Sequence, residues 1–245
     1  MGPAVEVFFF AMITAVATGL GALPFVFAKS LTRSWLGVSN AVAAGLMLAA
    51  SFGLVYEGLD YGPSRTLGGA LLGLLFIVVA RRALQRNEHP AVFASMNSLD
   101  ARKALLVVGV MTVHSFTEGV AVGVSFGGGL ELGLFITIAI AVHNIPEGLA
   151  ISLVLVPRGA RWTQAALWSV FSSLPQPLMA VPAFVFVEVF DALLPWGLGF
   201  AAGAMIWMVF SELLPDALEE SPADLVAVVV TVSVLAMTGF QVLIH

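Results

Sequence analysis

Long apolar stretches separated by short polar breaks dominate the chain. When the polar residues mark the boundaries, eight stretches are long enough, or nearly so, to cross a hydrocarbon layer of about 30 Å, which takes about 20 helical residues. The predicted spans are residues 4–28, 35–56, 66–84, 103–126, 132–156, 162–188, 193–214 and 223–244. The pattern predicts an all-α polytopic membrane protein with a single transmembrane domain, residues 1–245, and a cytoplasmic loop at residues 85–102.

The composition supports a membrane protein. Of the 245 residues, 60% are hydrophobic and 10% are charged, and the mean hydropathy is +1.02. A soluble domain carries roughly 25% charged residues. The first ten residues contain Glu6 but no Lys or Arg, so they lack the basic start of a secretory signal and are expected to begin the first span.

The basic residues predict the orientation of the spans. With the N-terminus outside, nine of the ten basic residues fall in cytoplasmic loops, and only Arg65 falls on the other side. The nine are Lys29, Arg33, Arg81, Arg82, Arg86, Arg102, Lys103, Arg158 and Arg161. Because Lys and Arg concentrate in cytoplasmic loops, we expect a multi-pass protein of the cell (inner) membrane with both termini outside.

Charge and cysteine content exclude some kinds of partner. The net charge is −5 and no run of basic residues is present, which argues against a nucleic-acid partner. There is no cysteine, so a bound metal would be held by His, carboxylate, amide, thioether or water. His89, alone in the polar loop, is expected to be solvated, with passing metal contact as the alternative.

Two spans carry the same charged pattern, H-x-x-x-E, at mid-membrane depth. The fourth has His114 and Glu118, and the fifth has His143 and Glu147. Positions i and i+4 share a helix face, so each span offers an imidazole beside a carboxylate. From the helical rise, both histidines lie roughly 16 to 18 Å into the membrane. Because the two spans run antiparallel, each His is level with the Glu of the other span, and the four groups are expected to enclose one divalent cation.

The ligand set indicates a class of metal. Imidazole with carboxylate suits Zn(II) first, and also Fe(II), Mn(II), Co(II) and Cd(II). The alternative is that the four residues form hydrogen bonds or ion pairs that hold the two spans together. Ionisable residues inside a membrane are costly and usually functional, so the repeated spacing favours the metal site.

Other polar residues extend the predicted pathway. In the sixth span Gln176 lies between Pro175 and Pro177, where broken backbone predicts a cavity lining with Gln176 facing it. The alternative is a plain proline kink with Gln176 bonded to a neighbouring helix. Glu212, with Asp216, lies near the cytoplasmic end of the seventh span and suggests an acidic exit.

Taken together, these motifs resemble the Zrt/Irt-like (ZIP) family of divalent metal transporters, most of all its bacterial GufA-type branch. The resemblance covers essentially the whole chain and is most specific at Asn144-Ile145-Pro146-Glu147-Gly148. It includes the paired H-x-x-x-E-G, the Gln176-Pro177 segment and Ser211-Glu212 in the seventh span. It implies a bundle of three, two and three helices with an inverted repeat, a homodimer, and import toward the cytoplasm by an elevator-like movement.

The resemblance also implies roles for individual residues. His114, Glu118, His143 and Glu147 match the first metal site of the family. An adjacent second site is completed in many relatives by residues at positions that are neutral here, which predicts one ion per protomer. These positions hold Ser115, Asn144 and Gln176.

Three further positions follow from the resemblance. Met47 and Ser51 match positions that line the pathway in the second span. Ser211 stands where many relatives have His, which leaves Glu212, with Asp216, as the exit residue.

The sequence therefore predicts a transporter rather than an enzyme. No phosphate-binding G-x-x-x-x-G-K-[ST] motif is present, and we expect a secondary transporter or channel-like carrier. The alternative is an intramembrane metal-dependent hydrolase. That reading lacks an H-E-x-x-H motif, and four ligands leave no obvious general base.

Overall fold

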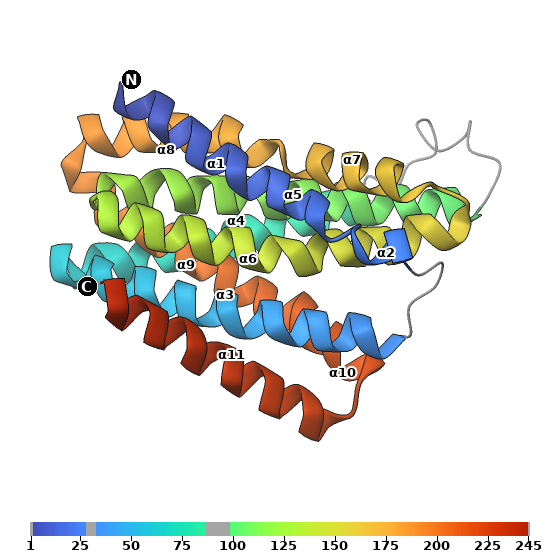
Figure 1. Ribbon diagram of the computed structural model, residues 1–245. Helices are drawn as coiled ribbons and strands as arrows, with labels where there is room; N and C mark the ends of the chain where they lie inside the picture. Colours follow the sequence, from blue (N-terminus) through green and yellow to red (C-terminus); the bar gives the residue numbers. More distant parts are fainter. Residues whose placement is uncertain (1, 28–32, 87–98, 245) are drawn as a thin grey trace.

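The computed structural model describes residues 2–27, 33–86 and 99–244, and in these ranges the regular structure is helical, without strands. The helices lie side by side in one elongated bundle (Figure 1). Their bounds are α1 Pro3–Leu20, α2 Pro24–Phe27, α3 Arg33–Tyr61, α4 Pro63–Arg86, α5 Leu99–Gly127, α6 Leu130–Leu155, α7 Trp162–Ser173, α8 Pro175–Val189, α9 Leu194–Met208, α10 Leu214–Glu220 and α11 Ala223–Ile244. Short 3₁₀ turns cover Val156–Arg158 and Asp191–Leu193, and a π-helical segment, Val209–Leu213, joins α9 to α10.

Seven helical segments in the described part of the chain are long and apolar enough to cross a membrane. They are Pro3–Phe27, Ser34–Tyr61, Pro63–Ala83, Leu130–Leu155, Trp162–Val189, Leu194–Glu220 and Ala223–Leu243. Each coincides with a predicted span. The remaining predicted span, 103–126, falls within α5, which is 29 residues long. The all-helical membrane fold is thus confirmed, with seven candidate spans.

The helices extend beyond several predicted boundaries. The second predicted span ends at residue 56, but α3 continues through Glu57 and Asp60 to Tyr61, because charged residues end an apolar stretch without ending a helix. Likewise, α4 runs to Arg86 and α5 begins at Leu99. Residues 87–98, which include His89, lie outside the described residues.

Proline accounts for the break in the sixth predicted span. Helix α7 ends at Ser173 and α8 begins at Pro175, since a proline fits the first turn of a helix but not its interior. By contrast, α6 continues through Pro146.

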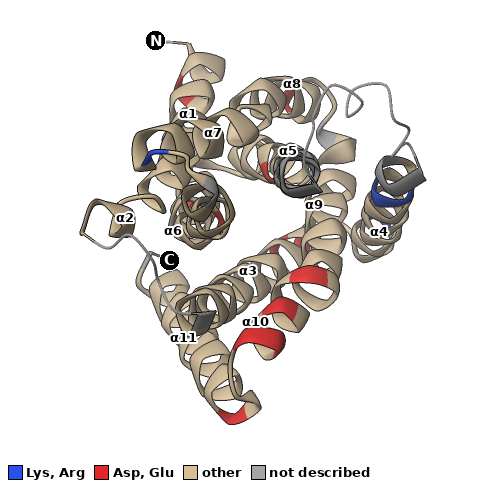
Figure 2. Cartoon of the chain, turned by 90° about the vertical axis from the view of Figure 1, so that its right-hand side faces the viewer, with Lys and Arg blue, Asp and Glu red and all other residues tan. Residues whose placement is uncertain are grey.

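The helix partners fall into two groups. Helices α1, α7 and α8 pack on the central pair α5 and α6, whereas α4 packs on α9 and α11 on α3. The groups meet where α3 packs on α6 and α5 on α9. Seen along the bundle in Figure 2, α5 and α6 lie next to each other, and α3 and α9 lie on the side of this pair that faces the second group.

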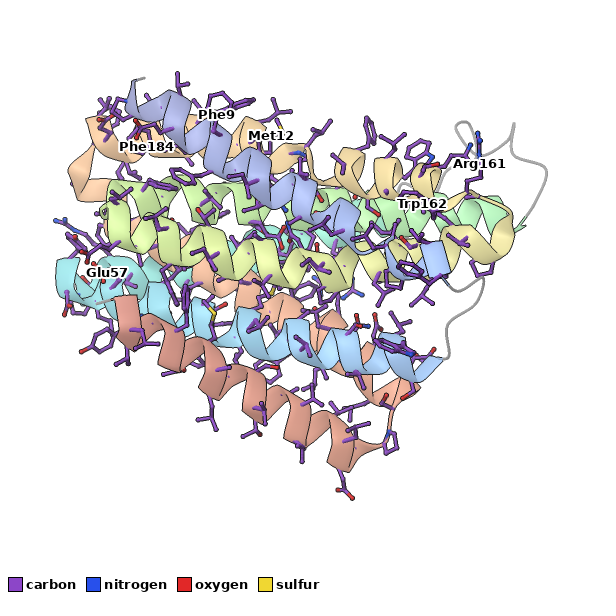
Figure 3. The ribbon with its side chains drawn as sticks, in the orientation of Figure 1. Phe9, Met12, Glu57, Arg161, Trp162 and Phe184 are labelled. Atoms are coloured by element: carbon purple, nitrogen blue, oxygen red, sulfur yellow. The ribbon has the colours of Figure 1, made fainter. Side chains whose placement is uncertain are left out.

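The outer surface of the bundle is apolar along its length. Leu71 of α4 and Leu235 of α11 expose 67% and 66% of their surface, and Phe9 on α1 exposes 51%. The labelled charged residues Glu57 and Arg161 lie instead toward opposite ends of the bundle (Figure 3). An apolar belt between polar ends is what lipid contact requires.

Candidate metal site

The two H-x-x-x-E motifs face each other in the middle of the bundle. His114 and Glu118 lie on α5, and His143 and Glu147 lie on α6. The Nε2 atom of His114 is 3.0 Å from Oε1 of Glu147, and Nε2 of His143 is 2.7 Å from Oε1 of Glu118. Each imidazole thus meets the carboxylate of the other helix, as the antiparallel arrangement predicts. His114 Nε2 is also 3.7 Å from Oε1 of Glu118, on its own helix.

The geometry fits a small cation. With ligands 2.0 to 2.2 Å from the metal, a tetrahedral zinc site places its donor atoms about 3.4 Å apart. Separations of 2.7, 3.0 and 3.7 Å bracket that value. One donor atom from each of His114, Glu118 and Glu147 lies within 4.8 Å of the other two.

The polar atoms of the site are buried and incompletely paired. All four side chains are at most 2% exposed. His114 Nε2 and Glu147 Oε1 approach to 3.0 Å, yet neither atom has a hydrogen-bond partner. Buried polar atoms that lack a hydrogen-bond partner are costly, and a cation bound to both atoms would satisfy them.

The second histidine, His143, is placed to share a proton or a metal ion with Glu118. Its Nδ1 lies 3.2 Å from the carbonyl oxygen of Ala139, which can only accept, so Nδ1 carries the proton of the neutral ring. In that tautomer Nε2 presents a lone pair to Oε1 of Glu118, 2.7 Å away. Two acceptors at that distance need a proton or a metal ion between them. A hydrogen bond from Nδ1 to a carbonyl is the usual support of a metal-bound histidine.

The glycine that follows each glutamate allows close packing behind the site. A Cβ atom on Gly148 would overlap the backbone of Thr18 in α1, and one on Gly119 would overlap the backbone of Gln176 in α8. Glycine is the only residue that lets these backbones approach so closely. The H-x-x-x-E-G motif thus fixes both the candidate ligands and the helices behind them.

The positions predicted as a neutral second site lie beside Glu118. Gln176 is fully buried, and its Nε2 donates to Oε2 of Glu118. Its Oε1 accepts from Asn144 Nδ2 at 3.1 Å and lies within hydrogen-bond distance of the Thr14 hydroxyl. Asn144 Nδ2 also reaches the carbonyl of Thr14, at 2.8 Å, while its Oδ1 has no partner. Ser115 is buried next to His114 in the sequence.

Gln176 therefore combines features of both sequence readings. It contacts a ligand of the candidate site, and it is bonded to neighbouring helices α1 and α6. Gln176 does not line the cavity that His114 and Glu147 border.

A cavity of about 420 Å³ runs from the candidate site to one end of the bundle. His114 and Glu147 line its inner part, and Glu212 and Asp216 line it further along, with Glu219 among the outer residues. Figure 2 views this end of the bundle, where acidic residues gather on α10. The exposed Asp216 and Glu219 show that the cavity reaches the surface.

The other two predicted pathway residues lie in the packed core of α3. Met47 and Ser51 are both fully buried, and the Ser51 hydroxyl donates to the carbonyl of Met47 at 2.7 Å. Neither belongs to the lining of this cavity. Their role in the pathway stays a prediction.

Two features of the site were not found by sequence reasoning. Thr14 was read as part of an apolar span, although Thr14 and Thr18, one turn apart, mark a polar face toward α7 and α8. The sequence identifies Arg81 only as one of the basic residues of the cytoplasmic side, but α4 places it beside Glu212, with its Nε 3.5 Å from Oε1.

Comparison with known proteins identifies related sequences. The sequence model of the ZIP zinc transporter family matches residues 80–244. A putative zinc transporter of Arabidopsis thaliana is 49% identical over 96% of this chain, which spans 38% of that protein. The zinc transporter GufA of Myxococcus xanthus is 35% identical over 84% of this chain and 85% of its own length. The zinc transporter ZIPB of Bordetella bronchiseptica is 33% identical over 82% of this chain and 69% of its own length. The chain belongs to the ZIP zinc transporter family, and its likeness to GufA agrees with the predicted GufA-type branch.

Proposed function

We propose that the protein transports divalent transition-metal ions across a membrane, with zinc as the main substrate, and that His114, Glu118, His143 and Glu147 hold the ion in transit. One observation carries the proposal. The two imidazoles and two carboxylates are buried and paired across α5 and α6, with His114 Nε2 and Glu147 Oε1 in contact but lacking hydrogen-bond partners.

The charges of the site match a dication. Two ionised carboxylates away from bulk water are expensive, and a divalent ion bound between them offsets that cost. Two neutral imidazoles complete four ligands without adding charge. The proposed transporter also carries Fe(II), Mn(II), Co(II) and Cd(II), because the same ligand types suit these ions. The names of the relatives support zinc first.

We further propose eight spans in a 3+2+3 bundle with an inverted repeat. Both chain ends lie at the same end of the bundle in Figure 1, as an even number of crossings requires. The helix partners support the repeat. An inverted repeat relates the first three spans to the last three, and the fourth span to the fifth. Each helix pair in one half should then have a counterpart in the other. The pairs α1–α6, α3–α11 and α3–α6 correspond to α8–α5, α9–α4 and α9–α5, and all six pairs pack together.

The proposed direction is import. The cavity opens at the end of the bundle that holds Arg161, which the distribution of basic residues assigns to the cytoplasm (Figure 3). An ion leaving the site through this cavity passes Glu212 and then Asp216. The same assignment puts both termini outside, in the cell (inner) membrane. The homodimer is proposed from the family resemblance alone.

We propose one ion per protomer. The second oxygen of Glu118 is engaged by the Gln176 amide rather than by another cation, and Ser115 and Asn144 add no charge. A second dication nearby would lack compensation.

Replacing Gln176 by Glu is expected to raise the zinc stoichiometry from one to two ions per chain. The new carboxylate would face Glu118, with the unpaired Asn144 Oδ1 as a further ligand. Without zinc the two facing carboxylates repel, so the metal-free variant should melt below the parent, and zinc should raise its melting temperature more. Metal analysis after dialysis and thermal melting in detergent measure both. A variant that still binds one ion would contradict this account of the neutral second site.

The hydrolase alternative is less well supported. The named relatives are zinc transporters. The four polar groups at the centre pair with one another, His114 with Glu147 and His143 with Glu118, and the proposal assigns all four to the metal, which leaves none of them as general base.

Reconstitution tests transport directly. Proteoliposomes loaded with a zinc-sensitive dye should show uptake that saturates with zinc, is inhibited by excess Cd(II), and exceeds the leak of protein-free vesicles. Uptake equal to that leak, from protein shown to be folded by its thermal melting, would refute the proposal.

A further inference from the structure

Arg81 lies where an ion leaving the candidate site would pass. Its Nε is 3.5 Å from Oε1 of Glu212, whose Oε2 is 3.6 Å from Nδ1 of His114. The chain of contacts therefore runs from Glu147 through His114 and Glu212 to Arg81. Among the cavity-lining residues that the structure describes, Arg81 is the one Lys or Arg, and the rest of the charged lining is acidic.

Both partners are held in place. Glu212 belongs to the π-helical segment Val209–Leu213, and such segments recur at functional sites because they redirect side chains. Its side chain is 13% exposed. The Arg81 guanidinium lies 5.2 Å from the ring centre of Trp207, two residues before that segment, and the Arg81 side chain is 32% exposed. This cation–π contact stabilises the guanidinium beside the carboxylate.

A positive charge in an acidic exit changes how strongly the exit holds a metal ion. Without a neighbouring positive charge, Glu212 would be a third carboxylate, after Glu118 and Glu147, that the departing ion could bind. It would then hold the ion at the exit. The guanidinium neutralises that carboxylate and repels a dication, and at partial exposure it can move aside toward solvent.

We propose that Arg81 is a positioning residue for metal release: it occupies Glu212 as a built-in counter-cation, is displaced when the ion passes, and then returns. The idea rests on the proposed transport function. Arg81 keeps the affinity of the exit for the metal ion low, so that the ion passes Glu212 without staying there.

The test compares Arg81→Gln with Arg81→Lys, which keeps the charge, and with Arg82→Gln, the exposed neighbour on α4. In zinc uptake by proteoliposomes, Arg81→Gln should lower KM and maximal rate together, by about five- to tenfold, because the ion is held more tightly. Arg81→Lys and Arg82→Gln should resemble the parent. In a Glu212→Gln background, the Arg81→Gln change should have no further effect, since the carboxylate it exposes is gone.

Equilibrium zinc binding separates this idea from the transport function itself. Titration against a competing chelator in detergent should show tighter binding by Arg81→Gln whether or not vesicles take up zinc. Unchanged constants in Arg81→Gln would overturn the proposal, as would a lower maximal rate with unchanged KM and a lower melting temperature, which indicates a structural role. A parent that binds zinc but does not transport it would refute the proposed function and leave the binding comparison to decide the role of Arg81.

Discussion

Replacing Glu147 by Ala is expected to reduce zinc uptake about 100-fold or more, to the leak of empty vesicles. Removing one member of a buried charged pair costs about 3–5 kcal/mol, and each 1.4 kcal/mol is tenfold in affinity. Glu147 also supplies half of the negative charge that offsets the dication. Its carboxylate is 3.0 Å from His114 and borders the cavity, so its loss opens the site on that side.

Two further variants show whether charge or space is responsible. Glu147→Gln keeps the shape and removes the charge, and should be nearly as inactive as Glu147→Ala. Glu188→Ala removes an exposed carboxylate of α8 and should transport like the parent. Normal uptake by Glu147→Ala would exclude this carboxylate as a ligand of the transported ion.

Replacing Gly148 by Val is expected to destabilise the protein by about 3 kcal/mol or more, since an added side chain here meets backbone rather than a flexible neighbour. The overlap is with Thr18 of α1, so α1 must move away from α6. That movement would also disturb Thr14 and its contacts with Gln176 and Asn144. The melting temperature in detergent should fall by about 10 °C, and uptake should be lost with it.

Gly239→Val is the matched control. Gly239 lies on α11, and a Cβ there meets no atom within 4 Å. Its substitution should leave both melting and uptake near the parent values. If Gly148→Val melted like Gly239→Val, the close contact between α1 and α6 would not be what fixes the position of Glu147.

The sequence was most informative where membrane physics leaves few choices. Backbone in lipid must satisfy its own hydrogen bonds, so apolar stretches of sufficient length become helices, and seven predicted spans coincide with candidate membrane helices. The meeting of His114 with Glu147, and of His143 with Glu118, follows from a four-residue spacing on two antiparallel neighbours. Both inferences use only local geometry and chain direction.

Contacts between helices distant in sequence could not be predicted in this way. The bonds of Gln176 to Thr14 and Glu118 join α8 to α1 and α5, and periodicity does not say which faces of these helices meet. The end of the predicted span 66–84 includes Arg81, but the sequence does not show that this side chain turns toward Glu212 on another helix. The π-helical turn that carries Glu212 depends on a shift in backbone hydrogen bonding that residue types do not encode.

Metal stoichiometry is the most direct test of the site. Parent protein dialysed against dilute zinc should retain one ion per chain, and His143→Ala should retain none, because His143 closes the site opposite His114 and pairs with Glu118 at 2.7 Å. His89→Ala, which removes a histidine of the predicted loop, should still retain one. Two ions in the parent would contradict the single site, and one ion remaining in His143→Ala would contradict a metal centre shared between α5 and α6.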